Sequence, residues 1–136
     1  MEIKEISLII GENMIQELKE IIVNGVTYIT KESQSKEAQK LDGMKYVIVR
    51  TYSAGVFAGY LEKREGKEVV LRNARRLWYW SGAASLSQLA MEGTKKPKEC
   101  KFPIAVDRIE LTETIEILDV TEIAKNSIES VSIWTA

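Results

Sequence analysis

Short apolar segments separated by turn signals, between residues 45 and 80, restrict the fold more than any other feature of the sequence. They are rich in β-branched and aromatic residues, which are typical of strands. Ser53-Ala54-Gly55 predicts a turn, and Glu65-Gly66 predicts a hairpin. Strands joined by tight turns indicate an antiparallel meander. We expect its strands at residues 45–52, 56–61, 68–72 and 74–80.

A helix is expected to follow the meander, over residues 81–91. Ser85-Leu86-Ser87-Gln88 fits a capping box, with Ser81 as an alternative cap one turn earlier. Gly93 is placed to end this helix. The next ten residues, TKKPKECKFP, predict a basic loop pinned by its two prolines.

The last third of the chain predicts a strand and a second helix. Residues 109–117 alternate as a strand, but Glu113 falls on the apolar side, so the strand must bend or a partner must meet the carboxylate. A helix is expected to start at residues 119–122, with Ile123, Ile128 and Val131 facing the core, before a short end strand. The predicted fold class is therefore α+β, with an antiparallel, possibly barrel-like sheet, a helix after the strand at 74–80 and a C-terminal helix.

The first 43 residues differ in character from this body. Residues 2–10 predict a strand, Asn13 could cap a helix that stops at Asn24-Gly25, and residues 26–29 predict a short strand. Residues 31–43 are polar and predict a linker. We therefore expect a strand–helix arm with its linker over 1–43 and a main α+β domain over 44–136.

The absence of histidine is the most informative property of the composition. It removes Ser–His–Asp and Cys–His nucleophilic machinery and the usual zinc sites, and the one cysteine, Cys100, cannot form a thiolate cluster. No phosphate-binding glycine motif is present. The acidic residues between 107 and 119 alternate between two faces of a strand, which favours a solvated face over a cation site. We expect a protein that is not an enzyme, with no cofactor and no metal.

The segment NARRLWYWSGAASLSQLA, residues 73–90, carries the clearest candidate binding site. Arginines beside tryptophans can neutralise an anion and stack a planar ring, and a helix start nearby adds free N–H groups. The alternative is that the tryptophans are core and the serines only caps. The candidate ligand-binding residues are Arg50, Tyr52, Arg72, Arg75, Arg76, Trp78, Trp80, Ser81 and Ser85.

Charge is distributed unevenly along the chain, although the net charge is only −1. Residues 45–101 contain twelve Lys and Arg and five Glu, a net charge of +7, and both flanks are acidic. Either these regions neutralise one another, within the fold or across an oligomer, or the basic middle meets an anion. The chain has no apolar run of about 18 residues and no signal peptide pattern, so we expect a cytoplasmic protein that does not enter a membrane.

Several segments resemble an uncharacterised family of small proteins encoded by bacteriophages and prophages. They are VIVRTYSAGVFAGYL (47–61), NARRLWYWSGAASLSQLA (73–90), KECKFP (98–103) and VDRIELTETIEILDVTEIAKNSI (106–128). The resemblance covers roughly residues 45–134 and implies a phage origin with an intracellular or virion-associated role. It implies no activity and assigns no site residues.

Three hypotheses for function follow. The first is a homo-oligomer that captures a nucleotide-derived, phosphate-containing molecule, such as a host immune signal, without cleaving it. The second is a structural or accessory phage protein whose Trp/Tyr/Arg cluster contacts another protein. The third is binding of single-stranded nucleic acid, which the net charge near zero disfavours. We favour the first.

Overall fold

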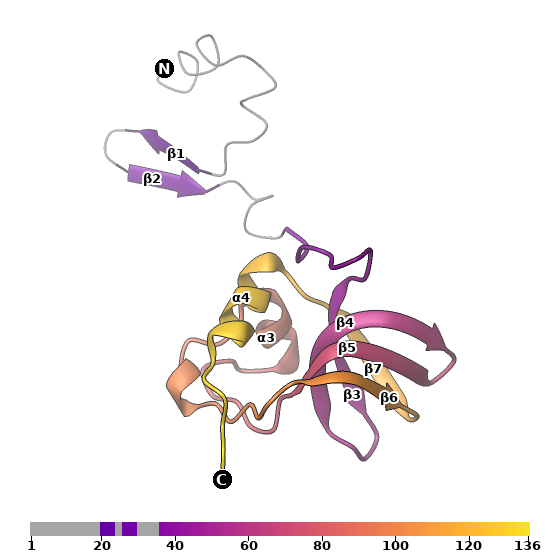
Figure 1. Cartoon of the computed structure of the whole chain (residues 1–136). Helices are drawn as coiled ribbons and strands as arrows, with labels where there is room; N and C mark the ends of the chain where they lie inside the picture. Colours follow the sequence, from indigo (N-terminus) through magenta and orange to yellow (C-terminus); the bar gives the residue numbers. More distant parts are fainter. Residues whose placement is uncertain (1–19, 24–25, 30–35) are drawn as a thin grey trace. The chain divides into compact units, whose positions relative to one another are not determined.

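The computed structural model describes residues 20–23, 26–29 and 36–136, and the chain forms two compact units, residues 1–36 and 37–136 (Figure 1). In the first unit, β1 (Glu20–Val23) pairs antiparallel with β2 (Val26–Ile29). The strand at 26–29 is confirmed. The helix expected up to Asn24 is wrong at residues 20–23, because the β-branched run EIIV pairs with VTYI. The rest of that helix and the strand expected at 2–10 lie outside the described residues.

The second unit is built on a five-stranded antiparallel sheet with two helices, which confirms the α+β class (Figure 1). Along the sheet the strands run in the order β6-β5-β4-β3-β7. Their bounds are β3 (Tyr46–Thr51), β4 (Val56–Glu65), β5 (Glu68–Arg76), β6 (Val106–Leu111) and β7 (Thr114–Asp119). The helices are α3 (Leu86–Glu92) and α4 (Glu122–Ser130), and η1 (Pro97–Glu99) is a short 3₁₀ turn in the basic loop.

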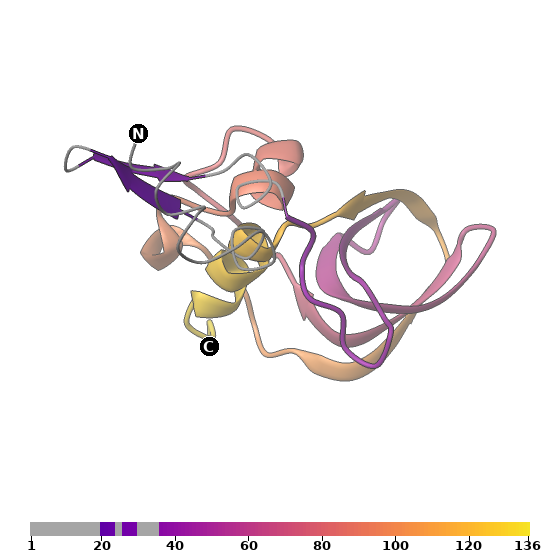
Figure 2. The same ribbon diagram turned by 90° about the horizontal axis from the view of Figure 1, so that it is seen from above.

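The sheet must curl, because its two edge strands are neighbours in the chain. β6 and β7 are linked only by Thr112 and Glu113. In a flat sheet they would lie about 19 Å apart, whereas a two-residue link spans at most about 11 Å. Figure 2 shows the resulting curl, although β6 and β7 do not pair and the barrel stays open. The expected bend at Glu113 is thus confirmed, and its side chain is exposed.

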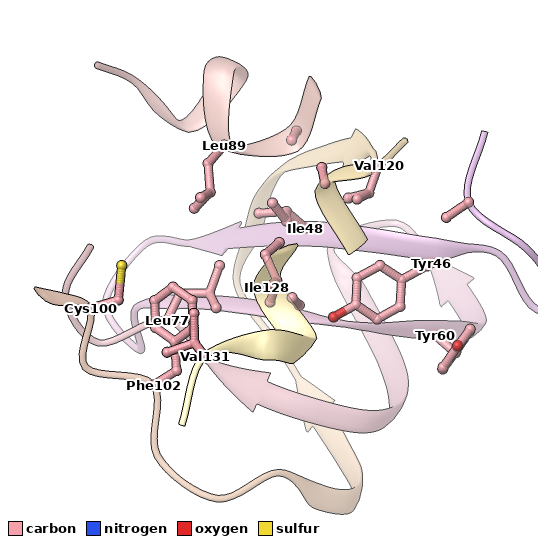
Figure 3. Close-up of a cluster of buried hydrophobic side chains, with 14 residues drawn as sticks. Tyr46, Ile48, Tyr60, Leu77, Leu89, Cys100, Phe102, Val120, Ile128 and Val131 are labelled. Carbon is pink, nitrogen blue, oxygen red and sulfur yellow. The ribbon is translucent and has the colours of Figure 1, made fainter. Parts of the chain in front are cut away.

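Alternation along the strands separates two hydrophobic cores. Val47 and Val49 of β3 face the inside of the curl with Phe57 and Leu71, and all four are at most 1% exposed. On the other face of β3, Tyr46 and Ile48 pack with side chains from α3 and α4 (Figure 3). The helices therefore cover the outer face of the curled sheet at β3, and the side chains of the inner face pack against one another.

The helix expected over residues 81–91 is confirmed from Leu86 onward but is wrong at residues 81–85, because Ser85 rather than Ser81 caps α3. The backbone N–H of Gln88 donates to Ser85 Oγ at 3.2 Å, and Gly93 ends α3 with a positive φ of 78°. In α4, Ile128 is fully buried as expected, but the inward position expected for Ile123 is wrong, since this side chain is 48% exposed. Ala124 faces the core instead, because it lies one helical turn before Ile128.

The strand expected over residues 74–80 is the main error within the sheet. β5 runs without interruption from Glu68 to Arg76, because Asn73 adopts a left-handed conformation with φ 50° and absorbs one extra residue there. Gly59 lies opposite this bulge, where a Cβ atom would come within 2.9 Å of a β5 carbonyl oxygen. Beyond Arg76 the chain leaves the sheet, and Tyr79 makes only a single bridge to Lys101.

Residues 37–43, which were expected to be part of the linker, belong to the second unit and pack against the rest of it. Ala38 is 3% exposed, and its N–H donates to the carbonyl of Val120 at 2.9 Å. Glu37 forms a bridge with Thr121. The compact unit thus begins at Glu37, seven residues before the expected start at Met44.

The alkaline stability of the protein should depend on Tyr46. Burial, with a smaller contribution from Glu129, raises the pKa of Tyr46 above its ordinary value of 10.0. The folded protein therefore keeps this proton when the unfolded chain has lost it, so this contribution to stability is intact below pH 10.0 and is lost above it. Above this pH, wild-type stability should fall more steeply than that of Tyr46→Phe, by up to about 1.4 kcal/mol per pH unit. Urea unfolding across the alkaline range measures the slopes, and equal slopes would contradict the prediction.

Candidate functional site

Arg75, one of the predicted site residues, is buried and bonded to the main chain of the protein. Its side chain is 8% exposed and donates to four main-chain carbonyl oxygens. Nε reaches Pro103 at 3.1 Å, Nη1 reaches Ile128 at 3.0 Å, and Nη2 reaches Phe102 at 3.0 Å and Val131 at 2.7 Å. Two of these carbonyls end α4, where a cation also opposes the negative end of the helix dipole. Burial lowers the pKa of this guanidinium.

Arg50 and Arg72 lie on the sheet surface in ion pairs. Arg50 Nε is 2.9 Å from Glu116 Oε1, across the β3–β7 pair. Arg72 pairs with Glu62 of β4. Both arginines are exposed, so these pairs contribute little to stability and leave the guanidinium groups accessible.

Arg76 and Tyr52 lie at the same end of β3, β4 and β5. Arg76 Nη1 donates to the carbonyl of Ala54 at 3.2 Å, and its guanidinium carbon lies 4.5 Å from the centre of the Phe57 ring. Tyr52 is 77% exposed. The Arg76 guanidinium is therefore hydrogen-bonded to the β3–β4 turn and is not directed at the start of α3.

Ser81 and Ser85 do not form an anion site with these arginines. Ser85 caps α3, and the Gln88 side chain accepts the N–H of Ala84 at 2.7 Å. α3 spans only seven residues. Ser81 Oγ lies 3.4 Å from a carboxylate oxygen of Glu99. The structure thus directs Arg75 to α4 and Arg76 to the β3–β4 turn, and it brings neither to the start of α3.

Trp78 and Trp80 have different environments. Trp78 is 63% exposed, so it is not a core residue. Trp80 is half-buried and packs against the core cluster that contains Leu77 and Phe102. The sequence analysis left open whether these tryptophans are site or core, and the structure gives a different answer for each.

Tyr79, the residue after Trp78, lies close to Lys101 and Trp134. We call these two aromatic rings and the lysine the platform. The ammonium nitrogen of Lys101 lies 5.8 Å from the centre of the Tyr79 ring and 5.6 Å from that of Trp134. Backbone pairing positions all three, since Tyr79 and Lys101 exchange hydrogen bonds and the Trp134 N–H donates to Phe102 at 3.0 Å. Tyr79 is 50% exposed and Trp134 43%.

The Trp134 groove borders this platform. It has a volume of about 410 Å³, within the range of small-molecule sites. Trp134 and Lys98 line it, together with Pro97, Cys100, Ser130, Ser132 and Ile133. Cys100 is 8% exposed, and its Sγ lies 3.6 Å from Thr94 Oγ1.

Sequence reasoning missed the platform because its members are far apart in the chain. Tyr79 falls within the strand expected at 74–80, Lys101 within the basic loop, and Trp134 near the C-terminus. The signal in the sequence is the basic loop itself: four lysines lie at 95, 96, 98 and 101, with Glu99 as the one acid among residues 95–101. An aromatic residue beside such a loop can supply a stacking surface.

The comparisons with known proteins give a family but no activity. Residues 44–128, more than half of the chain, match a family described as a domain of unknown function (DUF6948). The chain belongs to this family. The DUF6948 match begins at Met44 and covers the whole five-stranded sheet, α3 and most of α4. No curated protein and no solved structure matches the chain significantly.

Among the residues that the structure describes, no helix is both long and apolar enough to cross a membrane. No group of three or more Cys, Asp or Glu side chains among these residues is arranged to hold a metal ion.

Arg75→Ala should destabilise the protein by at least about 3 kcal/mol, since it removes four hydrogen bonds of a buried side chain, although the carbonyls of Phe102 and Ile128 keep backbone N–H donors. Arg72→Ala is the matched control on the same strand, and it should cost at most about 1 kcal/mol because its ion pair is exposed. Urea unfolding monitored by circular dichroism measures both. Equal costs for the two variants would show that the buried hydrogen bonds of Arg75 do not hold α4 in place.

Trp78→Ala and Trp80→Ala should differ in their effect on stability. Trp78 is mostly exposed, so its loss should cost at most about 0.5 kcal/mol. Trp80 packs on the core, so its loss should cost about 2 kcal/mol. Thermal unfolding of the two variants checks this, and a larger cost for Trp78 would contradict the assignment.

Proposed function

We propose that this protein binds a nucleotide-derived, phosphate-bearing small molecule and releases it unchanged. The observation that carries the proposal is the position of the Lys101 ammonium, near two exposed aromatic rings at the edge of a groove of nucleotide size. An ammonium group supplies three N–H donors to a phosphate. Each ring can stack a base, which contributes about 1–3 kcal/mol.

The charges of the basic loop support an anionic ligand. In residues 37–136, the ammonium groups of Lys95, Lys96, Lys98 and Lys101 have no carboxylate oxygen within 4.0 Å, whereas Lys45 pairs with Asp119 at 2.9 Å. Lys98 lines the Trp134 groove, and Lys101 lies at its border. A phosphate placed there would meet two cations that no described carboxylate neutralises.

The chemistry available at the groove supports binding without cleavage. The chain has no histidine, and Cys100 is the one thiol. Its Sγ lies near the carbonyls of Ser81 and Lys96, at 3.5 and 3.6 Å, rather than near a base. A buried thiol beside carbonyl oxygens is a poor nucleophile.

The finer parts of the proposal rest on the resemblance described above. A phage-encoded protein in the host cytoplasm would gain from capturing a host immune signal, because capture requires no catalysis. The acidic flanks and basic middle of the chain would also suit a homo-oligomer in which neighbouring copies neutralise one another. These two points are part of the same proposal and are tested with it.

Native mass spectrometry of the purified full chain, followed by heat release, should recover an intact phosphate-bearing compound. A thermal-shift panel of cyclic nucleotides and ADP-ribose derivatives should contain a stabilising ligand, since a 1,000-fold excess over Kd adds about 4 kcal/mol. Lys101→Ala should weaken binding at least about tenfold, and Lys63→Ala, which removes an exposed lysine of the sheet, should not. A hydrolysed product on release would contradict binding without cleavage. Equal affinities of the two variants would place the ligand elsewhere.

A second candidate function is a contact surface for another protein. Trp78, Ile104 and Ile133 are 63%, 69% and 56% exposed, and large exposed apolar side chains are typical of interfaces. This hypothesis predicts a stable protein partner and no response to the nucleotide panel. Trp78→Ala would then abolish the complex, whereas Lys101→Ala would have less effect.

A further inference from the structure

A groove lies beside β7, the strand at one edge of the sheet, and it shares no residue with the Trp134 groove. Its lining comes from two elements: residues 114–117 of β7, and Arg64, Gly66 and Lys67 at the end of the β4–β5 hairpin. It has a volume of about 420 Å³. We call it the β7 groove.

The outer edge of β7 has unused main-chain hydrogen-bonding groups. β3 pairs with β7 on one side, and on the other side the Thr114 N–H donates to the carbonyl of Lys67 at 3.0 Å. The pairing with β3 skips Ile115, which is the extra residue of a bulge, so regular strand geometry runs over residues 116–119. Within residues 37–136, no second strand pairs with this stretch. In an antiparallel strand every second residue directs its N–H and C=O groups away from its neighbour, so this edge can receive another strand.

Two cations beside this edge have no carboxylate partner in the part of the chain described from residue 37 onward. Arg64 Nε donates to the carbonyl of Gly66 at 3.0 Å, which holds the exposed guanidinium at the end of the hairpin. Neither Arg64 nor Lys67 has a described carboxylate oxygen within 4.0 Å of its charged nitrogens. The carboxylate that lines the groove, Glu116, is paired with Arg50 at 2.9 Å. The lining is therefore net positive and favours an acidic occupant.

The rest of the lining offers apolar contact and one unsatisfied hydroxyl. Ile115 is 49% exposed, and Ile117 is half-buried against the inner core of the sheet. Thr114 is 8% exposed, and its Oγ1 is the one buried side-chain atom without a hydrogen-bond partner among the described residues. Because buried polar atoms are normally hydrogen-bonded, this hydroxyl favours an occupant that carries polar main-chain groups as well as apolar side chains. An extended peptide has both.

We propose that an extended acidic peptide binds in the β7 groove and adds to the five-stranded sheet as a sixth strand next to β7. Its main chain exchanges hydrogen bonds with residues 116–119. Its carboxylates meet Arg64 and Lys67, and its apolar side chains contact Ile115 and Ile117. In this mode of recognition the main-chain hydrogen bonds supply affinity, and the side-chain contacts supply specificity. Binding here does not require the small molecule proposed for the Trp134 groove.

The test uses a synthetic peptide of sequence EVEVEV, acetylated and amidated at its ends, titrated into the isotope-labelled full chain and followed by NMR. We expect saturable shifts of the backbone amides of Glu116, Ile117 and Leu118. The peptide KVKVKV keeps the strand pattern but reverses the charge, so it should bind at least about tenfold more weakly. No saturable shift with EVEVEV, or equal affinity for the two peptides, would overturn the proposal.

Two methylated forms of the acidic peptide separate strand addition from attraction between charges alone. One carries N-methyl groups at every glutamate and the other at every valine. Only one set of N–H groups faces the sheet in an added strand, so one form should bind at least about tenfold more weakly than the other. Equal affinities of the two forms would contradict strand addition.

Variants of the hairpin test the role of the two cations. Arg64→Ala and Lys67→Ala should each weaken EVEVEV binding about five- to tenfold, because each removes a cation from the groove. Lys63→Ala is the matched control: Lys63 lies on the same hairpin, does not line the groove and is 3.4 Å from Glu65, so affinity should change less than about twofold. All three side chains are exposed, so the fold should be retained. Unchanged affinity in both groove variants, or an equal loss in Lys63→Ala, would also overturn the proposal.

Discussion

The guanidinium of Arg75 joins parts of the chain that the sheet alone would leave unconnected. From β5 it reaches the carbonyls of Ile128 and Val131 at the end of α4, and those of Phe102 and Pro103 in the loop before β6. No lysine could do the same, because one ammonium cannot hold a planar fork of donors against four separated acceptors. This side chain therefore fixes the end of α4 and the segment after it to β5 and to the loop before β6.

The curl of the sheet is the second constraint, and it explains why so small a unit has two cores. Because Thr112 and Glu113 alone link opposite edges, the inner face of the sheet closes on its own side chains, such as Val49 and Leu71. The outer face then needs another cover, which α3 and α4 provide over Ile48. The part of the sheet surface that the helices leave uncovered carries ion pairs such as Arg50–Glu116 and Arg72–Glu62.

The sequence predicted what depends on local signals. The meander, the cap at Ser85 and the bend at Glu113 follow from residue types and alternation within a few positions. The differences have long-range causes: residues 20–23 pair with a second strand, Ala38 bonds to Val120 in the link between β7 and α4, and the bulge at Asn73 carries β5 past its expected end. An arginine next to tryptophans suggests a site, but sequence alone cannot show that Arg75 instead bonds carbonyls 27 and 56 positions away.

The same limit applies to the candidate site, because its members are far apart in the sequence. Tyr79, Lys101 and Trp134 meet only because the short bridges beyond β5 bring three distant segments together. Ser132, Ile133 and Trp134, which follow the end of α4 at Ser130, line the Trp134 groove together with Pro97 and Lys98 of the basic loop. The groove is thus built from two segments that are distant in the sequence, and no local pattern of residues could show that they meet.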